Sequence, residues 1–128
     1  MLRLFGYTVP RRFGTYSIPI SIQSTYLRSF SSSHGAQFVL PVTEFYIPGN
    51  YSGLLNLIHS PDVKNIVCVS IYVFDELSKC RVVLDRFLDR NDLRVWCALE
   101  NEVSSPSETL AKLEVFRSLI KYSGINVD

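Results

Sequence analysis

The side chains best suited to chemistry follow two apolar segments that are expected to be strands of a sheet. Glu44 comes just after the segment 38–42, and Glu100 comes directly after the segment 93–99. Polar residues past the carboxyl ends of parallel strands lie where open α/β sheets bind ligands. Each carboxylate could therefore hold hydroxyl groups or accept a proton. Glu44 could equally be the partner of a helix dipole or of a loop arginine.

The loop after the first expected strand carries Arg11 and Arg12, just ahead of a helix. Two guanidinium groups beside the free N–H groups of a helix N-terminus suit a phosphate or a carboxylate. The alternative is that both arginines are simply solvated. The loop is neither a Walker loop nor a GxGxxG loop, because the glycine spacing of both motifs is absent.

Ser70 lies near the carboxyl end of the apolar segment 64–72, and Tyr72 follows on the same face of that segment. A buried serine bonded to the backbone is the simpler interpretation, since a nucleophilic serine needs a base nearby. Both histidines, His34 and His59, fall at expected helix ends on the opposite edge. A Ser-His-Asp triad is therefore not expected.

Neither a metal nor a cofactor is predicted. Glu44 and Glu100 could form a carboxylate pair, but two carboxylates without histidines are a weak metal signal. The cysteines, Cys68, Cys80 and Cys97, show no CxxC spacing. We expect three reduced thiols in the core of a cytoplasmic protein.

Strand-like and helix-like segments alternate along the chain. The expected strands are 2–9, 38–42, 64–72 and 93–99, and the expected helices begin near Pro19, Asn50, Asp75 and Ser105. The last start is the clearest, because Ser105, Pro106 and Glu108 form a capping box with proline at the first position. In the first helix, residues at intervals of four predict the buried face, namely Ile18, Ile22, Tyr26 and Phe30.

This alternation predicts an α/β fold with three layers, in which a four-stranded parallel sheet of order 2-1-3-4 is covered by helices on both faces. The whole chain, 1–128, would form one domain. All four strand-to-helix loops would then open on one edge of the sheet. Those loops are 10–18, 43–50, 72–76 and 100–106.

Composition limits the classes of function. The formal net charge is +1, which argues against a broad nucleic-acid surface, since such a surface needs an excess of lysine and arginine. The longest apolar run, 66–74, is far too short to span a membrane, and the N-terminus does not resemble a signal peptide. We expect a cytoplasmic protein with no nucleic-acid or membrane partner.

Several motifs together resemble one family. They are GYTVPRRFG (6–14), IPISIQ (18–23), VTEFYIPGNYSGLLNLI (42–58), IVCVSIY (66–72) and WCALE (96–100). In this order and spacing they are similar to the sporadic carbohydrate cluster proteins, which occur in bacterial surface-polysaccharide gene clusters. The resemblance covers about residues 5–121 and implies a role in making cell-surface carbohydrate.

The positions that match the family's motifs are Arg11, Gln23, Glu44, Pro48, Tyr51, Ser70 and Glu100. One departure concerns the first loop, where the family tends to have a serine before the loop arginine and this chain has Pro10. Any role of that hydroxyl is absent here.

A more distant resemblance is to the catalytic domain of serine recombinases, and it implies a resolvase-like or flavodoxin-like arrangement of the sheet. Those enzymes begin G-Y-x-R-V-S, whereas this chain has Thr8, Val9 and Pro10 in place of R-V-S. It also has no arginine in the segment 50–58, where they place arginines on the second helix. The fold is expected to be shared, but DNA strand exchange is not.

The resulting hypothesis is a protein that binds or transforms a sugar phosphate or a nucleotide sugar. The predicted catalytic residues are Glu44, Ser70 and Glu100, and the predicted substrate-binding residues are Arg11, Arg12, Gln23, Tyr51 and Tyr72. The alternative is a non-catalytic homodimer that serves as a scaffold for other enzymes of the same pathway.

Overall fold

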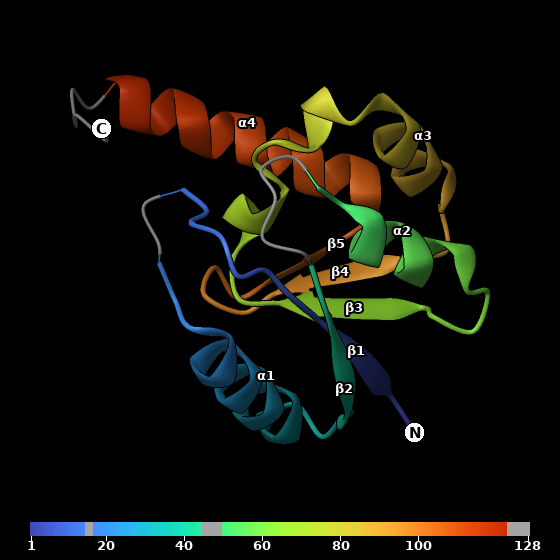
Figure 1. The fold of residues 1–128 in the computed structure, drawn as a ribbon. Helices are drawn as coiled ribbons and strands as arrows, with labels where there is room; N and C mark the ends of the chain where they lie inside the picture. The colour runs from blue at the N-terminus through green and yellow to red at the C-terminus, as the bar shows by residue number, and fades with distance from the viewer. Residues whose placement is uncertain (15–16, 45–49, 123–128) are drawn as a thin grey trace.

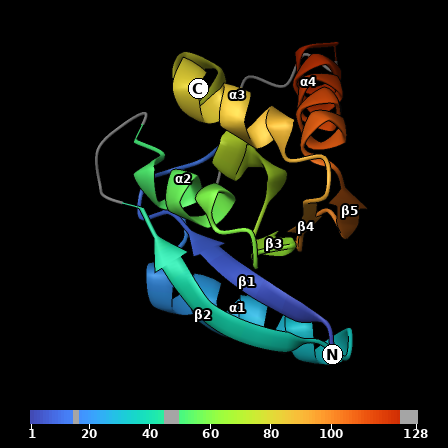
Figure 2. The same cartoon turned by 90° about the vertical axis from the view of Figure 1, so that its right-hand side faces the viewer.

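The computed structural model describes residues 1–14, 17–44 and 50–122. A twisted sheet lies between helix α1 (Ile20–Ser33) on one face and the other three α-helices on the opposite face, as Figures 1 and 2 show from two sides. Those three are α2 (Ser52–His59), α3 (Arg81–Asp89) and α4 (Pro106–Tyr122). The predicted α/β architecture is confirmed.

Five strands form the sheet, in the order β2-β1-β3-β4-β5. Their bounds are β1 Arg3–Thr8, β2 Gln37–Thr43, β3 Asn65–Cys68, β4 Arg94–Cys97 and β5 Glu102–Ser104. The first four are parallel and have the predicted order, whereas β5 is antiparallel to β4. The prediction of four strands was wrong because the chain reverses at Asn101, whose φ of 53° is one that asparagine tolerates.

The central strand β3 buries both of its faces. In β3, Ile66 and Cys68 belong to the core under α2, α3 and α4, whereas Val67 belongs to the core against α1. This alternation follows from the two-residue repeat of a strand, and it explains why Ile66, Val67 and Cys68 are all apolar.

The buried face of α1 differs from the predicted one. Its buried residues are Gln23, Leu27 and Ser31, whereas Ile22 is 56% exposed and Tyr26 is 42% exposed. The prediction of Ile22 and Tyr26 as core residues was therefore wrong by one position. The carboxamide of Gln23 hydrogen-bonds to the backbone around β1, and this contact sets the rotation of the helix.

The chain after β3 also departs from the prediction. β3 ends at Cys68, and two short 3₁₀ helices follow, η1 (Ile71–Phe74) and η2 (Leu77–Lys79), before α3 begins at Arg81. The predicted helix start at Asp75 was wrong, because that carboxylate binds other loops instead of capping a helix.

The predicted start of the last helix is confirmed. Ser105 and Glu108 form the capping box of α4, with each side chain accepting the other residue's backbone N–H. Gly35 follows α1 with a φ of +67°, the left-handed conformation that favours glycine. Pro48, one of the positions that match the family's motifs, lies outside the described residues. None of the helices in the described part of the chain combines the length and apolarity needed to cross a membrane.

Candidate functional site

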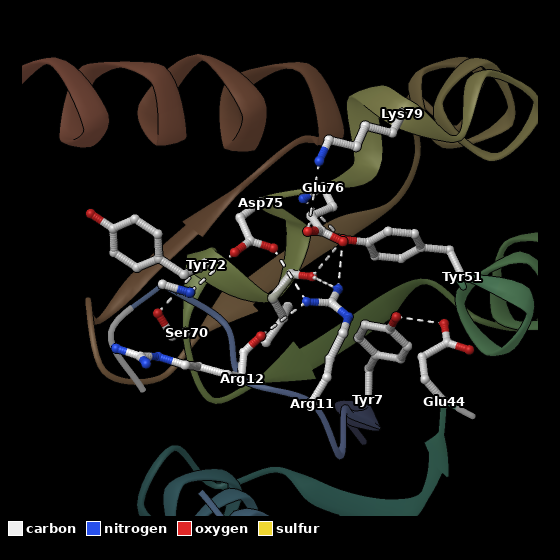
Figure 3. Close-up of polar contacts among 12 residues, drawn as sticks. Tyr7, Arg11, Arg12, Glu44, Tyr51, Ser70, Tyr72, Asp75, Glu76 and Lys79 are labelled. Atoms are coloured by element: carbon white, nitrogen blue, oxygen red, sulfur yellow. Dashed lines mark hydrogen bonds and ion pairs between the residues drawn. The ribbon is translucent and has the colours of Figure 1, made fainter. Parts of the chain in front are cut away.

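Arg11 is the centre of a buried polar network at the carboxyl edge of the sheet (Figure 3). Its side chain is only 8% exposed. The guanidinium donates hydrogen bonds to the hydroxyl of Tyr51 at 2.7 Å, to the carbonyl of Val73 at 3.1 Å and to the carboxylate of Asp75 at 3.3 Å. Within the described residues, its Nε is a buried donor without an acceptor. Arg11 is thus held by three partners that come from two other parts of the chain.

Tyr51 and Asp75 extend this network to the neighbouring loops. The Tyr51 hydroxyl donates to the carbonyl of Val73 at 3.0 Å and accepts the N–H of Glu76 at 3.2 Å. The second oxygen of Asp75 accepts the N–H of Gly14 at 3.1 Å, so this one carboxylate binds the arginine loop at two points. The loop after β1, the start of α2 and the segment after β3 are therefore tied together.

Glu44 is buried, with 3% of its surface exposed, and it caps α2. One carboxylate oxygen accepts the N–H of Gly53 at 2.7 Å, and the other accepts the N–H of Leu54 at 3.0 Å and the hydroxyl of Tyr7 at 2.5 Å. These N–H groups have no partner within the helix, and a negative charge is favourable at this end of it. This geometry matches the interpretation of Glu44 as the partner of a helix dipole.

Burial shapes the acidity of two tyrosines in this region. Burial, followed by the charge of Glu44, raises the pKa of Tyr7 well above its ordinary value. Burial also raises the pKa of Tyr51, although the charge of Arg11 acts in the opposite direction. Both hydroxyls therefore stay protonated at neutral pH and act as hydrogen-bond donors.

Ser70 and Glu100 form a second polar pair, one strand further along the edge. The Ser70 hydroxyl donates to Glu100 at 2.7 Å, and the other oxygen of Glu100 accepts the N–H of Ile71 at 2.7 Å. Ser70 is fully buried and also accepts the N–H of Tyr72 at 3.2 Å. Glu100 is only half-buried, so its carboxylate reaches the surface of the edge.

Gln23 serves the same arginine loop from the other side. Its carboxamide donates to the carbonyls of Val9 at 2.7 Å and Ile18 at 2.8 Å, and it accepts the N–H of Val9 at 3.3 Å. The side chain is fully buried. Gln23 therefore fixes the two ends of the loop that carries Arg11 and Arg12.

Arg12 and Tyr72 lie nearer to solvent, on the side of Figure 3 where Ser70 is drawn. Arg12 is exposed, and in the described part of the chain its guanidinium has no hydrogen-bond or ion-pair partner. Tyr72 is half-buried, and a Cβ at Gly14 would come within 2.8 Å of its ring. Gly14 has a φ of +57° and leaves room for that ring, so glycine is needed at this position for two reasons.

The structure thus brings the sequence-predicted residues to one edge in two groups. Arg11, Gln23, Glu44, Tyr51 and Ser70 are buried in structural hydrogen bonds, whereas Arg12, Tyr72 and Glu100 reach the surface. The sequence reasoning missed Tyr7 and Asp75. The position of Tyr7 inside β1 offered no polar signal, but Asp75 directly follows the apolar segment 66–74, as Glu100 follows its own strand.

The described residues contain no cluster of three or more histidine, cysteine, aspartate or glutamate side chains that could hold a metal ion. Cys68, Cys80 and Cys97 form no disulfide bond. Cys68 and Cys97 are opposite each other in β3 and β4 and lie in the core.

The fold is similar to that of two solved recombinase structures. The N-terminal catalytic domain of TP901-1 integrase matches with a TM-score of 0.59 and 18% identity, over 94% of this chain and 95% of that chain. A resolvase family site-specific recombinase from Streptococcus pneumoniae matches with a TM-score of 0.57 and 15% identity, over 96% and 93%. No family model matches the chain, and no curated protein matches it in sequence. The expected likeness in fold to serine recombinases is confirmed, and identities this low show the fold alone.

A test of the capping role is Glu44→Gln. The amide would place an NH₂ group or a neutral oxygen where two backbone N–H groups and a tyrosine hydroxyl now meet a carboxylate. We expect the free energy of unfolding, measured by urea denaturation, to fall by about 1–3 kcal/mol. The exposed ion-paired Glu114 is the matched control, and Glu114→Gln should change it by less than about 1 kcal/mol. Equal effects of the two substitutions would contradict the capping role.

The buried tyrosines predict a loss of stability in alkali. In the unfolded chain both tyrosines lose their protons near pH 10, whereas in the folded chain their raised pKa values keep them protonated. This contribution to stability is complete below about pH 10 and is lost as the pH rises further, at up to about 1.4 kcal/mol per pH unit for each tyrosine. Tyr51→Phe should therefore make the decline between pH 10 and pH 11.5 less steep than in the wild type. If urea unfolding experiments show equally steep declines in stability for the variant and the wild type, the pKa of Tyr51 is not raised in the folded chain.

Proposed function

We propose that this protein binds a phosphorylated or nucleotide-linked sugar at the carboxyl edge of its sheet, in the synthesis of bacterial surface carbohydrate. The observation that carries the proposal is the exposed guanidinium of Arg12, which has no partner among the described residues, on the same edge as the half-buried carboxylate of Glu100. A free cation suits a phosphate, and a carboxylate with unused lone pairs suits sugar hydroxyls. The motifs that resemble the sporadic carbohydrate cluster proteins supply the pathway, and we expect the protein to act in the cytoplasm.

The residues at this edge would have different roles in binding the ligand. Arg12 would bind phosphate, Glu100 would accept hydrogen bonds from hydroxyl groups or take a proton, and Tyr72 would flank the sugar. Ser70 would orient Glu100 through the 2.7 Å hydrogen bond between them. A carboxylate held in this way and open to solvent on one side is the group best placed for proton transfer.

The buried residues would position the binding groups without touching the ligand. Arg11, Tyr51 and Gln23 hold the first loop, and Glu44 holds the start of α2. We therefore assign the binding of phosphate to Arg12 and not to Arg11, whose charge is compensated by Asp75.

A non-catalytic homodimeric scaffold is the second candidate function. Val115 and Leu119 lie one turn apart on α4 and are 57% and 59% exposed, so they present apolar surface that a second copy of the chain would cover. DNA strand exchange is not favoured, because the serine of the R-V-S element has no counterpart in residues 8–11 and α2 contains no arginine.

The proposal predicts that Arg12→Ala weakens binding of glucose 1-phosphate and UDP-glucose, measured by titration calorimetry. Loss of a charge-assisted hydrogen bond should raise the Kd about tenfold or more. The control is Arg86→Ala, since Arg86 is an equally exposed arginine on α3, and it should leave the Kd unchanged. Equal binding by the wild type and the Arg12 variant would contradict the assignment. A protein that binds neither compound and sediments as a dimer would favour the scaffold.

A further inference from the structure

The charged side chains around the carboxyl edge are almost all neutralised by one another. Arg11 pairs with Asp75 at 3.3 Å, Lys79 with Glu76 at 3.8 Å and Arg117 with Glu114 at 2.7 Å. Arg12 has no acidic partner among the described residues, and the segments 15–16 and 45–49 contain no charged side chain at all. Among the side chains that the structure describes, this edge therefore offers a ligand one uncompensated positive charge.

The backbone donors at the starts of α2 and η1 are already used. In open α/β folds a pyrophosphate lies against the N–H groups of a helix that follows a strand. After β2 those groups belong to α2, and the carboxylate of Glu44 accepts two of them. After β3 the N–H groups of Ile71 and Tyr72 are bound by Glu100 and Ser70. A diphosphate bound at either of these two places would have to displace an internal acceptor.

Glu100 retains capacity for neutral hydroxyl groups. Each of its oxygens accepts one hydrogen bond within the protein, and a carboxylate oxygen can accept about two. It has no cation partner among the described residues, so its negative charge would repel a second phosphate placed beside it. Hydroxyl groups, which donate hydrogen bonds, match this carboxylate.

The strands that precede the two groups are close together in the sheet. Arg12 follows β1 and Glu100 follows β4, with β3 between those strands. Neighbouring strands lie about 4.8 Å apart, so β1 and β4 are roughly 10 Å apart. A ligand that contacts both groups therefore has to cross the end of β3.

We infer that the ligand is a sugar monophosphate, and not a nucleoside-diphosphate sugar, with its phosphate on Arg12 and its ring hydroxyls on Glu100. This inference rests on the proposed function and narrows it to one of the two substrate classes. The reasons are that Arg12 is the one free cation at this edge among the described side chains, that the N–H groups of α2 and η1 are internally occupied, and that Glu100 would repel a second phosphate.

The test is titration calorimetry of the full chain with three matched pairs of compounds. They are the 1-phosphates of glucose, galactose and N-acetylglucosamine, each compared with its UDP derivative, and inorganic phosphate is measured as well. The tightest-binding 1-phosphate should have a Kd roughly tenfold lower than its UDP partner. A UDP sugar that binds as tightly as its 1-phosphate, or more tightly, would overturn the inference and leave the proposed function standing. Binding of none of the six sugars would remove the proposed function itself.

Two variants separate the roles of the two ends. Glu100→Gln should raise the Kd of the preferred sugar 1-phosphate roughly tenfold and leave inorganic phosphate binding unchanged, because only the hydroxyl contact is altered. Arg12→Ala should weaken both. If Glu100→Gln weakens the binding of inorganic phosphate and of sugar phosphate equally, or weakens neither, Glu100 does not bind the sugar hydroxyls. Thermal unfolding of each variant shows whether it is folded. The comparison of sugar 1-phosphates with UDP sugars uses the wild type and does not depend on the variants.

Discussion

The buried charge of Arg11 is the constraint on which this edge of the molecule depends. A guanidinium that is 8% exposed would be strongly destabilising without partners, because the loss of hydration costs several kcal/mol. The chain meets this cost with the carboxylate of Asp75, the hydroxyl of Tyr51 and a backbone carbonyl. These partners can surround the charge only if the loop after β1, the start of α2 and the segment after β3 come together. The same contacts that satisfy the charge therefore build the edge.

Two glutamates illustrate how similar residues acquire different roles. Glu44 and Glu100 both follow parallel strands, and both accept N–H groups at the start of a helix, α2 for Glu44 and η1 for Glu100. Glu44 is buried and also accepts the hydroxyl of Tyr7, so its lone pairs are largely used. Glu100 is half-buried and has room for another donor. The degree of burial, and not the residue type or its place after a strand, separates the structural acid from the candidate ligand-binding acid.

The sequence was sufficient for features set by local chemistry and strand periodicity. The order of the parallel strands, the capping box at Ser105 and the placement of Arg12 and Glu100 on one edge could all be predicted. Features set by contacts between residues that are distant in the sequence could not be predicted. The rotation of α1 depends on the hydrogen bonds of Gln23 to Val9, and the early end of β3 depends on a glutamate that accepts the N–H of Ile71 and lies 29 residues further along the chain. Neither contact changes the pattern of apolar residues in α1 or in the segment that contains β3.

Arg11 holds the edge together, whereas its neighbour Arg12 lies at the surface without a partner among the described residues. The most direct measurement is the free energy of unfolding of Arg11→Gln and Arg12→Gln, determined side by side by urea denaturation. Removing one member of a buried ion pair should lower it by about 3–5 kcal/mol for Arg11→Gln, whereas the exposed Arg12→Gln should change it by less than about 0.5 kcal/mol. Equal and small losses of stability in both variants would contradict the account.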